Sequence, residues 1–262
     1  MASRADIAIQ DILTQHKSTG EPVAKLISKL TRSRGLGSKE RKLVADSVFD
    51  LLREKPWPEW FSKRIPAELE RALRSRPEPN IPIESLGETL WIDKGSLLIA
   101  QQIKAKPGER VLDLCAGSGG KTKILMSTGA HITAVDISDK RLLKIPGIKR
   151  IVADGRTVSL PAFDWILVDA PCSGTGTLRR APDIFGRLKE SDLANYATLQ
   201  KELVNNATKM LKPTGQLIYA TCSILEEENH TSFDNLKLLE SKQLLPTTDN
   251  CDGFYWARFQ RL

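Results

Sequence analysis

Two cysteines follow apolar runs of the sequence, and small polar residues surround both. Cys172 comes directly after residues 163–171 (FDWILVDAP), and Cys222 comes directly after residues 215–221 (GQLIYAT). A thiolate that adds to carbon 6 of a pyrimidine makes carbon 5 able to accept a methyl group, which splits one difficult step into easier ones. An acid near the ring nitrogen would stabilise the adduct, and a base must later remove the proton from carbon 5. Asp169 lies close enough in sequence to Cys172 to be that acid.

A lone cysteine is more often a small buried hydrophobic residue than a nucleophile. That interpretation suits Cys115 and Cys251, but the Pro, Ser, Thr and Gly neighbours of Cys172 and Cys222 do not favour it. The four cysteines lie 57, 50 and 29 residues apart and form no C-x-x-C pair. We therefore expect neither a metal site nor a disulfide scaffold, and the thiols should be reduced in a cytoplasmic protein.

A glycine-rich turn occupies residues 112–122 (LDLCAGSGGKT) between a strand and a helix. A P-loop needs glycine where the sequence has Cys115, and a dinucleotide fingerprint needs its third glycine where the sequence has Thr122. The remaining possibility is a nucleoside cofactor whose amino-acid part lies against the turn. S-adenosylmethionine fits, because it carries an amine for Asp113 to meet and no phosphate.

Two further acids support a nucleoside site. Asp136 lies 23 residues after Asp113, near the spacing of about 20 residues at which an acid binds ribose hydroxyls. Asp154 ends the next predicted strand, where it could meet the adenine edge. Since parallel strands present their carboxyl ends at one crevice, the cofactor site and both thiols should converge there.

The elements that must position these residues alternate from residue 91 onward. We expect strands at 110–116, 132–137, 151–155, 163–171, 215–223 and 254–262, and helices at 121–127, 191–211 and 226–241. Such alternation predicts an α/β fold with a doubly wound, mostly parallel sheet.

The first part of the chain has a different pattern. Residues 1–75 predict a small all-helical lobe, residues 76–90 a proline-rich linker, and residues 91–262 the catalytic domain. We expect Trp57 and Trp60 to pack these helices together.

Charge and composition narrow the class of protein. Residues 25–76 hold 14 basic and 7 acidic side chains, and this excess equals the net charge of +7 of the whole 262-residue chain. Such a lobe favours a nucleic-acid partner, the alternative being an ordinary solvated helix face. Apolar runs fall far short of the roughly 20 residues that span a bilayer. The first residues show no secretory signal, so we expect no membrane association.

At this point the residues resemble a known family, the RNA cytosine-5 methyltransferases of the Fmu/Sun type, and most closely its RsmB-like members. The matching motifs lie within residues 91–262: WIDKGSLLIAQ, VLDLCAGSGGKT, AVDIS, ADGR, DWILVDAPCSGTG, LRRAPDI, YATCSILEEEN and DGFYWARF. Residues 31–53 resemble part of the NusB-like RNA-binding domain that precedes the catalytic domain in RsmB-like enzymes.

The resemblance implies a Rossmann-like S-adenosylmethionine-dependent fold and a role for each matching residue. Cys222 would be the nucleophile and Cys172 the helper in product release, while Asp169 would pair with the cytosine ring beside Lys121. The implied S-adenosylmethionine site comprises Cys115, Ala116, Gly117, Ser118, Gly119, Gly120, Lys121, Asp136, Asp154 and Asp169. Arg179, Arg180 and Asp183 would shape the RNA side of the pocket. We expect a monomer whose partner is RNA, with 16S ribosomal RNA as the target.

Three departures from the family pattern bear on the target. Gly117-Ser118 stands where the family usually has Ala-Pro, residues 140–150 are short, and the subdomain before the catalytic core is reduced to about residues 76–90. Transfer RNA as the substrate and a non-catalytic RNA-binding or assembly factor remain the alternatives.

Overall fold

The computed structural model describes residues 3–85 and 88–262, which form two compact units. Unit 1 comprises Met1–Pro77 together with Thr177–Asp192, and unit 2 comprises Glu78–Gly176 together with Leu193–Leu262. The chain thus enters unit 2 near residue 77, within the predicted linker, and returns once to unit 1. The sequence-based division at 76–90 does not anticipate that return.

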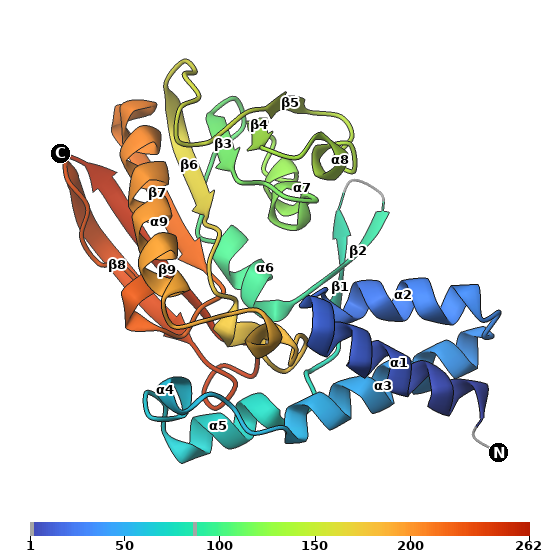
Figure 1. The fold of residues 1–262 in the computed structure, drawn as a ribbon. Coiled ribbons are helices and arrows are strands. Elements are labelled where there is room, and N and C mark those ends of the chain that lie inside the picture. Colours follow the sequence, from blue (N-terminus) through green and yellow to red (C-terminus); the bar gives the residue numbers. More distant parts are fainter. Residues whose placement is uncertain (1–2, 86–87) are drawn as a thin grey trace. The chain divides into compact units, whose positions relative to one another are not determined.

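Unit 1 is helical (Figure 1). Its helices are α1 (Arg4–Thr19), α2 (Val23–Ser33), α3 (Ser38–Glu54), α4 (Glu59–Ser62) and α5 (Ala67–Arg74). Apolar side chains spaced three and four residues apart give α1, α2 and α3 one buried face each, and Ile12, Leu26 and Val48 are fully buried between them.

Residues 177–192 pack on these helices through an aromatic cluster. The ring of Phe185 lies 4.8 Å from that of Phe61, 5.8 Å from Trp57 and 6.0 Å from Trp60, measured between centroids. Rings at these separations and tilts attract one another beyond the area that they bury. The prediction that Trp57 and Trp60 pack within the helical lobe is confirmed, and the segment that returns from unit 2 supplies their partner.

Buried polar contacts fix the same segment. The Asp183 carboxylate accepts a hydrogen bond from the backbone N–H of Val23 at 3.1 Å, which satisfies an open donor at the start of α2. Arg53 donates to the carbonyl of Arg179 through Nε at 3.2 Å and Nη2 at 2.8 Å. Asp183 is 4% exposed, so its carboxylate is committed to the helical unit.

Unit 2 is built on a sheet that has seven strands in the described part of the chain. The strands are β3 (Arg110–Leu114), β4 (His131–Asp136), β5 (Lys149–Val152), β6 (Phe163–Asp169), β7 (Leu211–Thr221), β8 (Leu236–Leu244) and β9 (Phe254–Arg261). Their order is β5-β4-β3-β6-β7-β9-β8, parallel from β5 to β7, with β9 antiparallel to both β7 and β8. A separate antiparallel pair of β1 (Ile81–Ser85) and β2 (Glu88–Ile92) begins in the stretch predicted as a linker, residues 76–90, and ends two residues beyond it.

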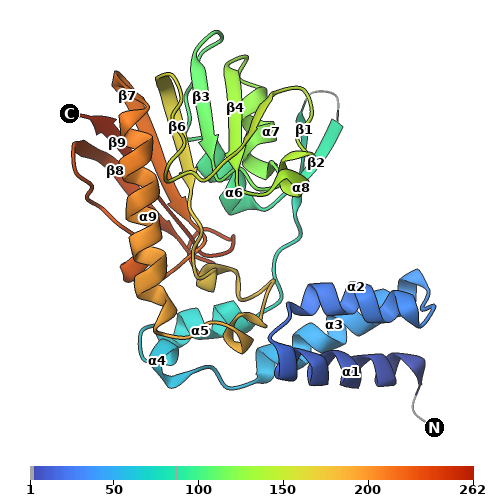
Figure 2. The same ribbon diagram turned by 45° about the horizontal axis from the view of Figure 1, so that its top comes forward.

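Helices cover both faces of the sheet (Figure 2). They are α6 (Lys94–Ala100), α7 (Gly120–Met126), the single turn α8 (Asp139–Leu142) and α9 (Asp192–Lys209). Alternate residues of β3 face opposite ways, so Leu112 packs in the core beneath α9, whereas Val111 packs in the core beneath α6 and α7. The predicted doubly wound, mostly parallel sheet is confirmed.

One predicted helix, residues 226–241, is wrong. The chain there makes a short 3₁₀ turn, η3 (Glu226–Glu228), and then the edge strand β8. Asn235 has φ of 58°, a left-handed conformation that turns the chain into the strand. Since β8 is exposed on both faces along most of its length, its sequence lacks the alternation that identifies a half-buried strand.

Asp183→Ala should destabilise the first turn of α2. The substitution leaves the buried N–H of Val23 unpaired and removes a negative charge from the positive end of the helix dipole, a loss of about 1–2 kcal/mol. Hydrogen exchange measured on peptides from the start of α2 should accelerate. The exposed Arg187 of the same segment supplies the control, Arg187→Ala, and equal exchange in the two variants would contradict the assignment.

Candidate active site

The glycine-rich turn between β3 and α7 has a backbone conformation that few residues adopt. Cys115, Gly117 and Gly119 have φ of 70°, 57° and 83°. A Cβ on Gly119 would lie 2.5 Å from Cγ1 of Ile145, so that position has no room for a side chain. The turn therefore places backbone N–H groups, rather than side chains, at the carboxyl end of β3.

Asp136 braces this turn from the end of β4. Its carboxylate accepts from the backbone N–H of Gly117 at 2.9 Å and of Ser138 at 2.8 Å, and pairs with Arg141 at 2.8 Å. The carboxylate is almost fully buried. Asp136 thus sets the shape of the turn while lying beside the space predicted for the ribose.

Asp113 lies beneath the turn and is 1% exposed. Thr122 donates to its Oδ2 at 2.6 Å, while Oδ1 is buried and has no hydrogen-bond partner within the described structure. Burial raises the pKa of Asp113 to about 7, against the opposing effect of the hydrogen bond from Thr122. The group is therefore poised to gain or lose a proton near neutral pH.

A cavity of about 320 Å³ opens beside the turn. It is lined by Cys115, Val135, Asp136, Ile137, Arg141, Ala153, Asp154, Gly155, Arg156, Pro171, Leu199 and Leu203. Small-molecule sites typically run from about 300 to 1,000 Å³ and combine apolar walls with a few polar groups. The cavity brings together three residues predicted for the cofactor, namely Cys115, Asp136 and Asp154.

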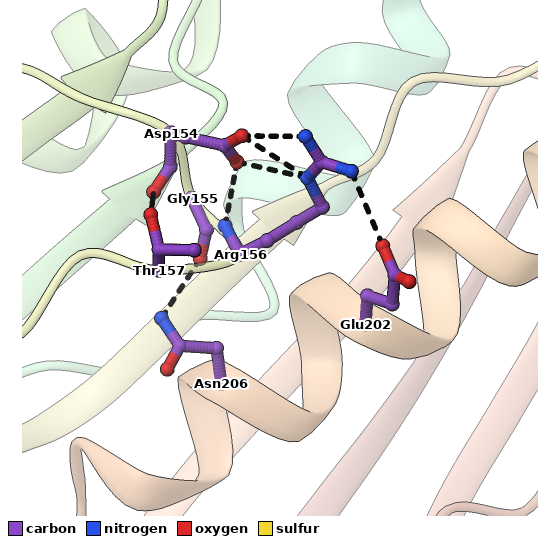
Figure 3. A network of polar contacts seen from close by, with 6 residues as sticks. All are labelled: Asp154, Gly155, Arg156, Thr157, Glu202 and Asn206. Carbon is purple, nitrogen blue, oxygen red and sulfur yellow. Dashed lines mark hydrogen bonds and ion pairs between the residues drawn. The ribbon is translucent and has the colours of Figure 1, made fainter.

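Asp154 stands at the rim of this cavity in a network with α9 (Figure 3). The Arg156 guanidinium donates to both of its carboxylate oxygens, at 2.6 to 3.1 Å, and also reaches Glu202 at 3.4 Å. Hydrogen bonds from the side chain and backbone of Arg156 lower the pKa of Asp154, so the carboxylate is charged. Asn206 holds the adjoining carbonyl of Gly155 at 2.9 Å.

Lys121 and Asp169 form an ion pair across the crevice. Lys121 Nζ lies 2.7 Å from Asp169 Oδ2, with the two side chains 11% and 32% exposed. Burial alone would lower the pKa of Lys121, but the charge of Asp169 and its hydrogen bond outweigh burial and raise it. The lysine is therefore a fixed cation that links the start of α7 to the end of β6.

The two predicted thiols meet next to this pair. Cys172 Sγ and Cys222 Sγ lie 3.2 Å apart. The hydrogen bond with Cys222, together with burial, raises the pKa of Cys172 well above the usual range. Cys172 therefore keeps its proton and can donate it to the sulfur of Cys222. Cys222 in turn contributes to the raised pKa of Lys121, so Cys222 and Lys121 share one electrostatic environment.

Close backbone contacts hold the loop after Cys172. A Cβ on Gly176 would lie 1.9 Å from the carbonyl oxygen of Gly253, and Gly253 N–H donates to the Gly176 carbonyl at 2.8 Å. Gly176 N–H donates to the carbonyl of Cys222 at 3.0 Å. Glycines at 176 and 253 are thus needed for the loop to pass beside the second thiol.

Sequence reasoning missed a buried carboxylate behind the thiols. Glu228 is fully buried and contacts Ser173, Ser223 and Gln200. It is the third residue of the run 226–228 (EEE), and the incorrect helix at 226–241 gave no reason to separate it from its exposed neighbours. The signal that could have found it is its position, six residues after Cys222 within the quoted motif.

A sequence model described as 16S rRNA methyltransferase RsmB/F matches residues 100–239. The chain belongs to this family. Ribosomal RNA small subunit methyltransferase B of Erwinia tasmaniensis is 38% identical over 181 residues, covering 58% of this chain and 42% of that protein. The protein of the same name from Yersinia enterocolitica is 39% identical over 207 residues, covering 68% of this chain and 48% of that protein. The chain spans less than half the length of these curated relatives.

Solved structures show the same fold. The crystal structure of PH0851 matches 98% of this chain and 80% of its own length, with a TM-score of 0.68 and 22% identity. NSun6 from Pyrococcus horikoshii, solved with SFG, matches 68% of this chain and 56% of its own, with a TM-score of 0.59 and 23% identity. A methyltransferase homolog protein from the same organism matches 65% and 67%, with a TM-score of 0.54 and 25% identity. Unit 2 therefore has the Rossmann-like fold of S-adenosylmethionine-dependent methyltransferases.

Residues 3–85 and 88–262 contain neither a candidate metal cluster nor a helix that could span a membrane. No group of three or more His, Cys, Asp or Glu side chains there could hold a metal ion. None of the helices in these ranges has the length and apolar character needed to cross a bilayer.

The raised pKa of Asp113 predicts a pH-dependent stability. Below about pH 4 the carboxyl is protonated in both the folded and unfolded chains, and its contribution to stability is complete. As the pH rises towards 7 the unfolded chain loses this proton while the folded chain keeps it, so stability falls by up to about 4 kcal/mol. Asp113→Asn should remove that loss, and urea unfolding at pH 4.5 and pH 8 should show a clearly larger advantage for the variant at the higher pH. The same difference at both pH values would contradict the assignment.

Proposed function

We propose that this chain transfers a methyl group from S-adenosylmethionine to carbon 5 of a cytosine in RNA, through a covalent bond between Cys222 and carbon 6. The observation that carries the proposal is the pair of thiols 3.2 Å apart beside the Lys121–Asp169 ion pair. One nucleophile, one neutral thiol and one charged pair are the set that this chemistry needs. A non-catalytic RNA-binding factor would have no use for this arrangement.

The residues around the turn fit S-adenosylmethionine. The cavity beside Cys115, Asp136 and Asp154 suits the adenosine part, since it has apolar walls and carboxylates at its rim. The backbone donors of the turn and the buried Asp113 suit the amino-acid part, because a carboxylate accepts hydrogen bonds from N–H groups and an acid pairs with an amine. The cofactor, when bound, supplies the methyl group.

The protein side chains then have separable tasks. The thiol of Cys172 lies within hydrogen-bond distance of the Cys222 sulfur, and the nearby cation Lys121 attracts negative charge on the sulfur that attacks carbon 6. As the sulfur–carbon bond forms at carbon 6, negative charge develops on the ring, and the Lys121–Asp169 pair can hold a proton at the ring nitrogen. After methylation a base takes the proton from carbon 5. The electrons of that carbon–hydrogen bond restore the double bond between carbons 5 and 6, and the bond to Cys222 breaks with its electrons returning to the sulfur. Cys172 lies beside that bond and assists its cleavage.

Ribosomal RNA of the small subunit is the proposed target because the relatives carry that function in their names. The net positive charge of residues 25–76 suits a polyanion. Carbon 5 and carbon 6 must be approached from the ring face, so the base must be unpaired or turned out of a helix. Transfer RNA is the alternative target.

Cys222→Ala should lower methyl transfer by about 10³-fold or more, because the neighbouring thiol of Cys172 keeps its proton and is a poor replacement for the nucleophile. The measurement uses tritiated S-adenosylmethionine with total RNA from a host that lacks this protein, followed by bisulfite sequencing to locate the protected cytosine. Cofactor affinity should stay near that of the wild type, since Cys222 does not line the cofactor cavity. Loss of cofactor binding would place the thiol in a different role, and a site in transfer RNA would keep the mechanism and change the substrate.

Cys172→Ala should trap the enzyme on its RNA. Without the second thiol the bond between Cys222 and carbon 6 forms but breaks slowly, so a complex that survives a denaturing gel should accumulate. The double variant Cys172→Ala/Cys222→Ala is the matched control and should form none. If the single variant turns over normally, Cys172 has no part in release.

A further inference from the structure

The loops that carry the two thiols are joined by one buried carboxylate. Ser173 follows Cys172 in the loop after β6, and Ser223 follows Cys222 in the loop after β7. Glu228 Oε2 accepts hydrogen bonds from both hydroxyls, from Ser173 Oγ at 2.5 Å and from Ser223 Oγ at 2.6 Å. A single side chain therefore spans the residues next to both sulfurs.

The other carboxylate oxygen strengthens the link to the Cys172 loop. Glu228 Oε1 accepts from the backbone N–H of Ser173 at 2.8 Å and from Gln200 Nε2 at 3.1 Å. Gln200 Nε2 also donates to the carbonyl of Pro171 at 3.0 Å. Cys172 is thus held through the residue before it and the residue after it.

The backbone of Glu228 is itself anchored. The hydroxyl of Tyr219, in β7, donates to the Glu228 carbonyl at 2.5 Å. The next residue, Asn229, donates through Nδ2 to the Ser223 carbonyl at 3.2 Å. Glu228 is therefore held at two places. Its main-chain carbonyl is bound to Tyr219 of β7, and its carboxylate is bound to the loop after β6.

Burying the Glu228 carboxylate costs desolvation free energy, so stability alone does not explain a carboxylate at this position. Glu228 is 0% exposed, and the donors to its carboxylate that the described structure shows are neutral hydroxyl, amide and backbone groups. An apolar side chain of similar size would fill the same space at less expense of desolvation. What a carboxylate does, and an apolar side chain does not, is to fix four donors from three chain segments in one geometry.

We propose that Glu228 is a positioning residue that sets the separation of Cys172 and Cys222, so that both sulfurs reach one pyrimidine. This inference rests on the proposed function. Glu228 acts through the serines that follow the thiols, since the hydrogen bonds that its carboxylate accepts in the described structure come from Ser173, Ser223 and Gln200. A displacement of about 1 Å in a reacting group can cost on the order of 10²-fold in rate, and that is the loss expected when the link is removed.

The chemistry of the link distinguishes two substitutions. In Glu228→Gln the amide oxygen can still accept from Ser173 N–H and Gln200, while the amide nitrogen donates to the two hydroxyls, which rotate to accept. In Glu228→Ala the link is lost. The rate constant kcat should fall about 10²-fold in the alanine variant and less than about 10-fold in the glutamine variant, with KM for RNA unchanged in both.

The second measurement reports thiol separation without RNA. Phenylarsine oxide bridges two neighbouring thiols, forming two arsenic–sulfur bonds and releasing one water, and a monothiol wash removes reagent bound to a single thiol. Intact mass should show one retained arsenic in the wild type and in Glu228→Gln, and little in Glu228→Ala. Glu226→Ala, an exposed carboxylate of the same turn, should match the wild type in both measurements, and Cys222→Ala should retain none.

The outcomes separate this inference from the proposed function. A folded Glu228→Ala chain that retains arsenic and its kcat overturns the positioning role. If that variant does not fold, Ser223→Ala decides, because it breaks the link at Cys222 while the carboxylate keeps its other donors. An unchanged kcat and arsenic retention in Ser223→Ala would overturn the proposal. If the wild type methylates no RNA, the proposed function fails, and the arsenic measurement still tests whether Glu228 holds the thiols together.

Discussion

The ion pair between Lys121 and Asp169 is the contact on which the rest of the site depends. It joins the first residues of α7 to the last residue of β6, across the crevice at the carboxyl edge of the sheet. Both charges are largely removed from water, so each is tolerable only because the other is present. The glycine-rich turn lies on the lysine side and the Cys172 loop follows the aspartate, so the pair links the turn to the loop that carries the first thiol.

The same edge of the sheet uses buried acids in three different ways. Asp136 is committed to the backbone of the turn and to Arg141. Asp113 is so desolvated that its pKa rises to about 7. Glu228 is surrounded by neutral donors that belong to the thiol loops. Asp136 shapes the glycine-rich turn, Asp113 can change its charge near neutral pH, and Glu228 links the two thiol loops, because the partners of each carboxylate differ.

The sequence identifies the polar and thiol side chains at the strand ends better than it identifies the residues that hold them in place. Strand ends identify Asp113, Asp136, Cys172 and Cys222 because a parallel sheet must gather them at one edge, and the structure does so. Glu228 is invisible to that logic, since its burial depends on a 3₁₀ turn where periodicity predicts a helix. The return of residues 177–192 to unit 1 is hidden for a similar reason. The contacts of Asp183 with Val23 and of Phe185 with Phe61 join residues more than a hundred positions apart, and no local pattern reports them.

The short connection between β4 and β5 is the clearest departure of this sequence from the family pattern, and it changes how this part of unit 2 is packed. With only the single turn α8 in that place, Leu142 and Ile145 are fully buried against Ala134 and do the packing that a longer helix would share. Ile145 also fills the space where Gly119 has no side chain. The exposed apolar residues Ile137, Leu143 and Val152 remain on this flank, and Ile137 lines the cavity beside Asp136. The shortened connection therefore keeps the support of the glycine turn and leaves apolar side chains exposed on the flank beside this cavity.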